Sequence, residues 1–259
     1  MSESRRVTAA ALIIGNEILS GRTQDVNLQF LGIELNKLGI QMREARVVPD
    51  IEQEIVEAIN QSRARYDYVF TTGGIGPTHD DITADCVAKA FGQKLIHHPV
   101  AEKLLRERIE KMGAEVTEAR LRMARTPEHA ELLINEVGGA PGFKVDNVFV
   151  MAGIPRVMQA MFASAVSFLE GGVTMLSRTI GSYVNEGTIA TGLSLLQDDY
   201  PDLDIGSYPF YIDNKPGTNL VLRGPEQGRL DEAAGRLHDL IVDLGGTPVD
   251  GGVDTSKAV

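Results

Sequence analysis

The chain has 259 residues, of which 43% are hydrophobic and 24% are charged, a balance that is ordinary for a folded globular protein and excludes disordered and collagen-like classes. The formal net charge of -11 argues against a broad nucleic-acid-binding face, which would be basic. No stretch approaches the length of a membrane span, so we expect neither nucleic acid nor a membrane as a partner. The single cysteine, Cys86, forms no internal disulfide, which favours a reducing, cytoplasmic location.

The first half of the chain alternates strand and helix patterns. Residues 7–14 form a continuous apolar run, typical of a parallel strand that is covered on both faces. Leucines recur every three or four residues over 28–38 and predict an amphipathic helix. Further strands are predicted at 40–48 and 66–70, with a helix at 51–59 between them. This order indicates a three-layer α/β/α domain with a mostly parallel sheet.

The second half contains the best linker in the chain, Gly171-Gly172, because paired glycines interrupt regular structure. Beyond the linker we predict a small α+β domain, with strands at 174–184, 203–206 and 218–222 and helices at 186–196 and 230–244. We therefore expect domains at 1–170 and 171–250, followed by a loose tail at 251–259. The small domain is expected to build a homo-oligomer or to act as a lid, and the alternative is a stabilising appendage.

One glycine-rich segment, Thr-Thr-Gly-Gly-Ile-Gly-Pro-Thr-His-Asp-Asp-Ile-Thr at 71–83, follows an apolar strand and opens a helix. Glycines let a backbone approach a ligand without an intervening Cβ. The free N–H groups of such a turn and helix start suit a phosphate. The phosphate-binding residues expected in this loop are Gly73, Gly74, Gly76, Thr78 and Thr83.

Two aspartates in the same loop, Asp80 and Asp81, would repel a bound phosphate. A divalent cation such as magnesium, manganese or cobalt removes this conflict, because hard cations take oxygen ligands from one or two carboxylates and from substrate phosphates. The loop therefore predicts a divalent metal held by Asp81 and Asp80. The alternative is a tight turn in which one of these aspartates caps the helix. Glu17, just after the first strand, is a further candidate ligand for the metal or the substrate.

Six basic residues lie on the segments that follow the loop. We expect most of them to be solvated helix surface, and a minority to reach an anionic ligand, since arginine binds phosphate through paired N–H groups. The six are Arg106, Arg108, Lys111, Arg120, Arg122 and Arg125.

Four ordered motifs between residues 7 and 168 resemble the molybdopterin-binding-domain family. They are Gly15-Asn16-Glu17-Ile18-Leu19-Ser20-Gly21, the 71–83 loop, Gly139-Ala140-Pro141-Gly142-Phe143 and Ala152-Gly153-Ile154-Pro155. Within this family they are most similar to the N-terminal part of the branch of the competence/damage-inducible protein CinA. The segment 205–209 resembles the companion module of that branch. The chain ends before the C-terminal amidohydrolase domain that such proteins often carry, so we do not expect that activity.

The resemblance implies a MogA-like fold and assigns roles to individual residues. Related MogA and MoaB proteins and adenylyltransferase domains bind molybdopterin at the 71–83 loop. Asp81 matches the aspartate that this superfamily associates with magnesium and catalysis, and Asp80 resembles an additional acid of the CinA branch. The same resemblance implies ligand contacts at Asn27, Gly153 and Pro155.

The CinA branch is also associated with metal-dependent hydrolysis of ADP-ribose and related nucleotide diphosphates, including FAD and coenzyme A. We therefore expect a divalent-metal-dependent nucleotide-diphosphate hydrolase with Asp81 as the main metal ligand. Asp80 and Glu17 are the candidates for a second ligand or for orienting the attacking water. The alternative is a non-catalytic molybdopterin-binding module, or a molybdopterin adenylyltransferase, so the expected ligand is a nucleotide diphosphate or a pterin phosphate.

Overall fold

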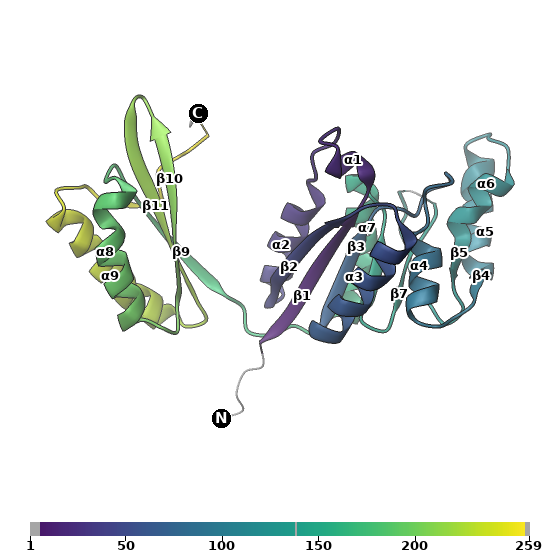
Figure 1. Ribbon diagram of the computed structural model, residues 1–259, viewed down its shortest axis with the longest axis horizontal. Coiled ribbons are helices and arrows are strands. Elements are labelled where there is room, and N and C mark those ends of the chain that lie inside the picture. Colours follow the sequence, from purple (N-terminus) through teal and green to yellow (C-terminus); the bar gives the residue numbers. More distant parts are fainter. Residues whose placement is uncertain (1–5, 138, 257–259) are drawn as a thin grey trace. The chain divides into compact units, whose positions relative to one another are not determined.

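The computed structural model describes residues 6–137 and 139–256 (Figure 1). The chain divides into two compact units, Met1–Val173 and Thr174–Val259. Within the described ranges, no helix is both long and apolar enough to span a membrane. Residues 257–259 of the tail that we expected to be loose lie outside the described residues.

The first unit is built on a six-stranded sheet with the order β2-β1-β3-β8-β7-β6. Four of its strands run parallel and adjoin one another: β2 (Ile40–Val48), β1 (Val7–Ile14), β3 (Tyr68–Thr72) and β8 (Val148–Met151). The remaining edge is antiparallel and consists of β7 (Gly142–Val145) and β6 (Glu131–Leu133). The predicted mostly parallel sheet is thus confirmed.

Helices cover both faces of this sheet (Figure 1). One face carries α3 (Glu52–Arg65) and α4 (Thr83–Ala90), and the other carries α2 (Asn27–Lys37) and α7 (Pro155–Ala165). Alternate residues of β1 serve the two faces, since Leu12 packs in the first core and Ala11 in the second. Burial on both sides explains why β1 reads as an uninterrupted apolar run, and the predicted three-layer architecture is confirmed.

A small excursion interrupts the first unit between α4 and β6. It contains the helices α5 (Pro99–Lys111) and α6 (Glu118–Leu121), the 3-10 turn η1 (Arg122–Ala124), and the strand pair β4 (Leu95–His97) and β5 (Arg125–Pro127). Leu105, Ile109 and Leu121 form its own hydrophobic cluster. This cluster folds the chain back after α5, so that η1 and β5 return toward α4.

The second unit is a four-stranded antiparallel sheet with two helices, which confirms the predicted small α+β domain. The strand order is β10-β11-β9-β12, and the helices share one hydrophobic core with the sheet. Its elements are β9 (Leu176–Ser182), α8 (Glu186–Asp199), β10 (Asp204–Ile212), β11 (Lys215–Gly224), α9 (Gln227–Asp243) and β12 (Val249–Asp250). The strands β10 and β11 form a longer hairpin than the sequence indicates. After β12, the Val253 N–H donates to the Asn219 side chain at 2.7 Å.

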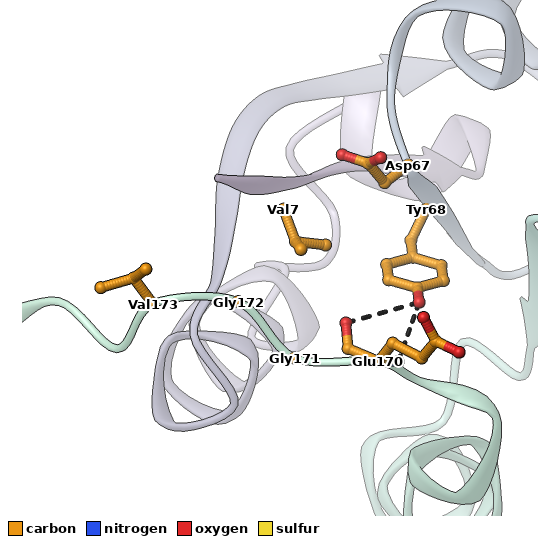
Figure 2. Close-up of a pocket in the computed structure, with 7 residues that line it drawn as sticks. All are labelled: Val7, Asp67, Tyr68, Glu170, Gly171, Gly172 and Val173. Carbon is orange, nitrogen blue, oxygen red and sulfur yellow. Dashed lines mark hydrogen bonds between the residues drawn. The ribbon is translucent and has the colours of Figure 1, made fainter. Parts of the chain in front are cut away.

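The segment leading out of the first unit is held against the start of its sheet (Figure 2). The Glu170 N–H donates to the Tyr68 hydroxyl at 2.9 Å. A Cβ built at Gly171 would overlap the Leu38 carbonyl oxygen, and one built at Gly39 would overlap the Gly172 carbonyl oxygen. The two backbones therefore meet at a distance that only glycine allows at these positions.

Candidate functional site

The 71–83 loop lies where the strand order of the parallel sheet reverses. The chain goes from β1 to β2 on one side and then to β3 on the other side of β1. In open α/β sheets, ligands bind in the crevice outside the carboxyl ends of the strands at such a switch point. The turn that begins at Gly15 follows the carboxyl end of β1, and the loop that begins at Gly73 follows the carboxyl end of β3.

Two glycines set the path of the loop. Gly73 has φ +102°, and a Cβ there would overlap the Ile14 carbonyl oxygen at the end of β1. Gly74 has φ +68°, and a Cβ there would overlap the Thr83 hydroxyl. Because both positions combine left-handed backbone with close contact, each requires glycine, and the loop lies directly on the neighbouring strand.

Thr83 is fully buried and holds the base of the loop. Its hydroxyl donates to the Gly73 carbonyl at 3.0 Å, and its N–H donates to the Gly74 carbonyl at 3.0 Å. Since the hydroxyl is committed to the backbone inside the protein, we assign Thr83 to positioning the loop and not to direct contact with a substrate.

Three oxygens of Thr78, Asp80 and Asp81 converge at the tip of the loop. The Thr78 hydroxyl oxygen lies 2.5 Å from Asp80 Oδ1 and 2.6 Å from Asp81 Oδ2, and the Thr78 N–H donates to Asp81 Oδ2 at 2.8 Å. A hydroxyl has one proton to donate, so at any moment one of the two carboxylates lacks it. The hydrogen bond from Thr78 favours the charged form and lowers the pKa of Asp80 below its usual value.

Neither aspartate caps the helix that follows. The N-cap position of α4 is Ile82, whose side chain makes no capping hydrogen bond. Asp81 instead bonds back to Thr78 within the loop. This geometry does not support the helix-cap alternative and leaves both carboxylates directed at the loop.

The donor set of this loop fits a divalent cation that is shared with a substrate. Two carboxylates and a hydroxyl supply hard oxygen donors, and a Cβ at Gly76 would lie 2.6 Å from Asp81 Oδ2. Among residues 6–137 and 139–256, no cluster of three or more acidic, histidine or cysteine side chains could hold a metal. Magnesium sites often use one or two protein carboxylates, with water and phosphate oxygens as the remaining ligands. Asp80 and Asp81 would supply the protein carboxylates of such a site.

Glu17 lies at the same edge of the sheet, in the short helix α1 (Asn16–Leu19). Its side chain is exposed and folds back over Gly15, where a Cβ would overlap the carboxylate. The Asn16 N–H donates to Asp50 Oδ2 at 2.8 Å. Asp50 was not predicted as a site residue, although it follows the end of a strand, the signal that led to Glu17.

Asn27 and Gly153 form a wall beside the loop. Asn27 is only 4% exposed, and its Nδ2 donates to the Gly153 carbonyl at 2.8 Å. A Cβ at Gly153 would lie 3.4 Å from the Gly73 Cα, so the 152–155 turn adjoins the loop. Pro155 is exposed in the first turn of α7.

A recess on the loop is lined by Gly74, Gly76 and Asp81 together with Arg122 and Arg125 of the excursion. The motif at 139–143 also reaches this recess, through Pro141 and Phe143. Of the six basic residues that the sequence offered, the fold thus brings two to the predicted site.

Cys86 of α4 takes no part in this chemistry. It is fully buried, and burial raises the pKa of its thiol to about 12. A protonated thiol is a poor nucleophile and metal ligand, so Cys86 serves as a core residue.

A second recess lies at the opposite edge of the same sheet (Figure 2). Val7 and Tyr68, which begin β1 and β3, line it together with Asp67 and the segment 170–173. Asp67 Oδ2 accepts from both the N–H and the hydroxyl of Thr8 at 2.8 Å. Its carboxylate is bonded to the protein, and the position at the amino ends of the strands does not suit a ligand site of this fold.

Comparison with known proteins gives matches along both units. Residues 10–171 match the family model described as "Probable molybdopterin binding domain", and residues 174–244 match the model described as "FAD synthase, middle domain". A protein of Archaeoglobus fulgidus is 33% identical over 231 residues, which are 89% of this chain and 96% of that protein. The crystal structure of the protein CinA from Thermoplasma acidophilum, described as having unknown function, is 34% identical, with a TM-score of 0.58 over 63% of this chain and 99% of that one.

Other relatives are longer than the matched region. A competence-damage inducible protein of Clostridioides difficile is 40% identical over 162 residues, which are 61% of this chain and 39% of that protein. A protein of Pyrobaculum calidifontis is 40% identical over 163 residues, which are 62% of its length. The similarity to these relatives therefore concerns one part of each molecule.

Proposed function

The chain belongs to the molybdopterin-binding-domain family, with a CinA-like first unit and a second unit that matches the middle domain of FAD synthase, and from this premise we propose that it is a divalent-metal-dependent nucleotide-diphosphate hydrolase. Its substrates would be ADP-ribose-like or FAD-like molecules, in which a pyrophosphate joins two parts. Water adds to one phosphorus, the bridging P–O bond breaks, and two phosphate monoesters leave.

The observation that carries this proposal is the combination of free N–H donors and converging carboxylates in one loop. In the described part of the chain, the N–H groups of Gly74, Ile75 and Gly76 donate to no protein acceptor. Backbone N–H groups in such a turn bind phosphate oxygens. Asp80 and Asp81 converge on Thr78 in the same loop, so anion donors and cation ligands lie together.

Each part of the loop has a role in the proposed reaction. The free N–H groups would bind and orient the phosphate whose P–O bond breaks. Asp81 would be the main metal ligand, with Asp80 beside it. A divalent cation bound there would polarise the pyrophosphate oxygens and lower the pKa of water. Asp80 and Glu17 remain the candidates for orienting the attacking water, since both are exposed carboxylates at this edge of the sheet.

A second candidate function rests on the family description. The same N–H groups would bind the terminal phosphate of molybdopterin, and Asn27 or Glu17 would contact the pterin. In this alternative the first unit captures molybdopterin without chemistry, or adenylylates it. It differs from the hydrolase in predicting pterin binding and no release of AMP from nucleotide diphosphates.

The test is a substrate panel. Purified protein is incubated with ADP-ribose, FAD, coenzyme A or NAD in the presence of magnesium, manganese or cobalt, and the products are separated by chromatography. We expect metal-dependent release of AMP or, from coenzyme A, of the corresponding adenosine bisphosphate. No release from any substrate, together with measurable pterin binding, would overturn the hydrolase and favour the molybdopterin-binding module.

A further inference from the structure

The arginines that the excursion brings to the loop are fixed at their backbones. Arg125 begins β5 and pairs with His97 of β4. The carbonyl of Ala124, between the two arginines, accepts from the His98 N–H at 3.0 Å. Arg122 and Arg125 both line the recess beside Gly74, Gly76 and Asp81. Strand pairing therefore fixes the backbone of Arg125, and the Arg125 N–H donates to the Arg122 carbonyl at the end of η1.

The hydrogen bonds of Arg122 and Arg125 are incomplete. Arg125 donates through Nη2 to Asp85 at 3.0 Å, but its Nε is buried and has no acceptor. Arg122 also has a buried Nε without an acceptor, and among the described residues it forms no ion pair. Buried donors are almost always paired in folded proteins, so these two N–H groups need an explanation.

Other arginines of the excursion do not share this property. Arg106 pairs with Glu102 at 2.6 Å, Arg108 donates to the Val137 carbonyl, and Arg120 donates to the Glu115 carbonyl. Asp81 lines the same recess as Arg122 and Arg125. Among the described residues, however, neither arginine forms an ion pair with the Asp81 carboxylate. The recess, about 10 Å³ in volume, therefore combines two guanidinium groups whose Nε donors find no acceptor among the described residues.

We propose that Arg122, supported by Arg125, binds the second phosphate of the substrate while the loop N–H groups bind the first, so that the site selects diphosphates over monophosphates. This inference rests on the proposed function for the placement of one phosphate on the loop. Guanidinium groups bind phosphate through paired, charge-assisted hydrogen bonds. Arg125 is oriented by Asp85, whereas Arg122 forms no ion pair among the described residues that would compete with a ligand.

The experiment measures the binding of inorganic pyrophosphate and of inorganic phosphate to the full chain by calorimetry in the presence of magnesium. The readout is binding alone and does not depend on catalytic turnover. For the unaltered protein we expect tighter binding of pyrophosphate than of phosphate. Arg122→Gln should weaken pyrophosphate binding by about ten- to a hundredfold, the usual effect of losing a charge-assisted hydrogen bond, and should change phosphate binding less than about twofold. Arg122→Lys, which keeps the charge, should recover part of the loss.

Arg106→Gln is the matched control, because it removes the same charge from the same excursion at a residue that pairs with Glu102 and does not line the recess. Unchanged pyrophosphate binding in Arg122→Gln would overturn the inference, as would a wild-type protein that does not bind pyrophosphate. Pyrophosphate binding that depends on Arg122 in a protein without turnover would support the inference and reject the hydrolase. Turnover with binding independent of Arg122 would do the reverse.

Discussion

The two edges of the first sheet are built alike but differ in what their charged groups contact. At the carboxyl edge Gly73 lies on the end of β1, and at the amino edge Gly39 lies on the segment after α7. Both contacts exclude any Cβ, and a recess adjoins each. At the amino edge, Asp67 bonds to Thr8 and Tyr68 bonds to Glu170. At the carboxyl edge, three N–H groups and the Arg122 Nε find no acceptor in the part of the chain that the structure describes.

The comparison shows that a position restricted to glycine does not by itself mark a functional site. Close backbone contact serves both the joining of segments and the approach of a ligand. What separates the two edges is the presence of polar groups that the fold positions and leaves unpaired, which is costly unless a ligand or water completes them. The predictions below test whether the two edges differ in function as well as in structure.

The largest expected effect on stability is that of Gly73→Ala. The new Cβ would overlap the Ile14 carbonyl oxygen in a left-handed backbone, and we expect a loss of about 3 kcal/mol in the free energy of unfolding, together with loss of phosphate binding. Gly39→Ala should destabilise similarly and leave phosphate binding intact. Denaturant unfolding and calorimetry measure the two properties.

Gly92→Ala serves as the control for backbone strain. Gly92 has φ +62° but no heavy atom within 4 Å of a built Cβ, so we expect a loss of only about 1 kcal/mol. Equal losses in Gly73→Ala and Gly92→Ala would show that close contact with β1 contributes nothing, contrary to the comparison.

A smaller effect is expected at the amino edge from Tyr68→Phe. This change removes the hydroxyl that accepts from the Glu170 N–H, and we expect a loss of about 1 kcal/mol in unfolding free energy with no change in turnover. Tyr211→Phe is the matched control, because Tyr211 is exposed and its hydroxyl has no partner within the described ranges. A fall in turnover in Tyr68→Phe without unfolding would mean that the amino edge takes part in function.

The smallest expected effect is a change in one pKa at the carboxyl edge. The Thr78 hydroxyl lowers the pKa of Asp80, so Thr78→Val should raise that pKa toward the usual value of an aspartate. The sign follows from the charged form, which loses a hydrogen bond and becomes less favoured. Titration of the Asp80 carboxyl carbon by NMR would measure the change. An unaltered pKa would show that Thr78 does not hold this carboxylate in solution.

Local patterns predicted most of the first unit. The expected strands at 7–14 and 40–48 coincide with β1 and β2, and burial on both faces accounts for the apolar composition of β1. The strand before the loop continues to Thr72, beyond its aromatic and β-branched core. The β10–β11 hairpin is longer than predicted, since β10 extends through Pro209 to Ile212. Proline lacks an N–H, but an edge strand such as β10 tolerates that loss.

The basic side of the site could not be predicted, for a physical reason. Arg122 and Arg125 reach the loop only because β5 pairs with β4 and because α6 packs against α5. A further contact, the hydrogen bond from Arg125 to Asp85 of α4, also joins residues that are distant in the sequence. Spacing along the chain does not distinguish these six basic residues from one another. It therefore does not indicate which of them the tertiary fold places beside the loop.

The most direct test of the central claim compares one carboxylate at each edge of the sheet. Asp81→Asn keeps the shape of the side chain and removes its charge at the carboxyl edge. Asp146→Asn does the same in the exposed turn before β8, at the amino edge, where φ is +52° and asparagine is tolerated. AMP released from ADP-ribose is measured with manganese for both variants. We predict a loss of at least about a hundredfold for Asp81→Asn and wild-type release for Asp146→Asn. Full, metal-dependent release by Asp81→Asn would contradict the account.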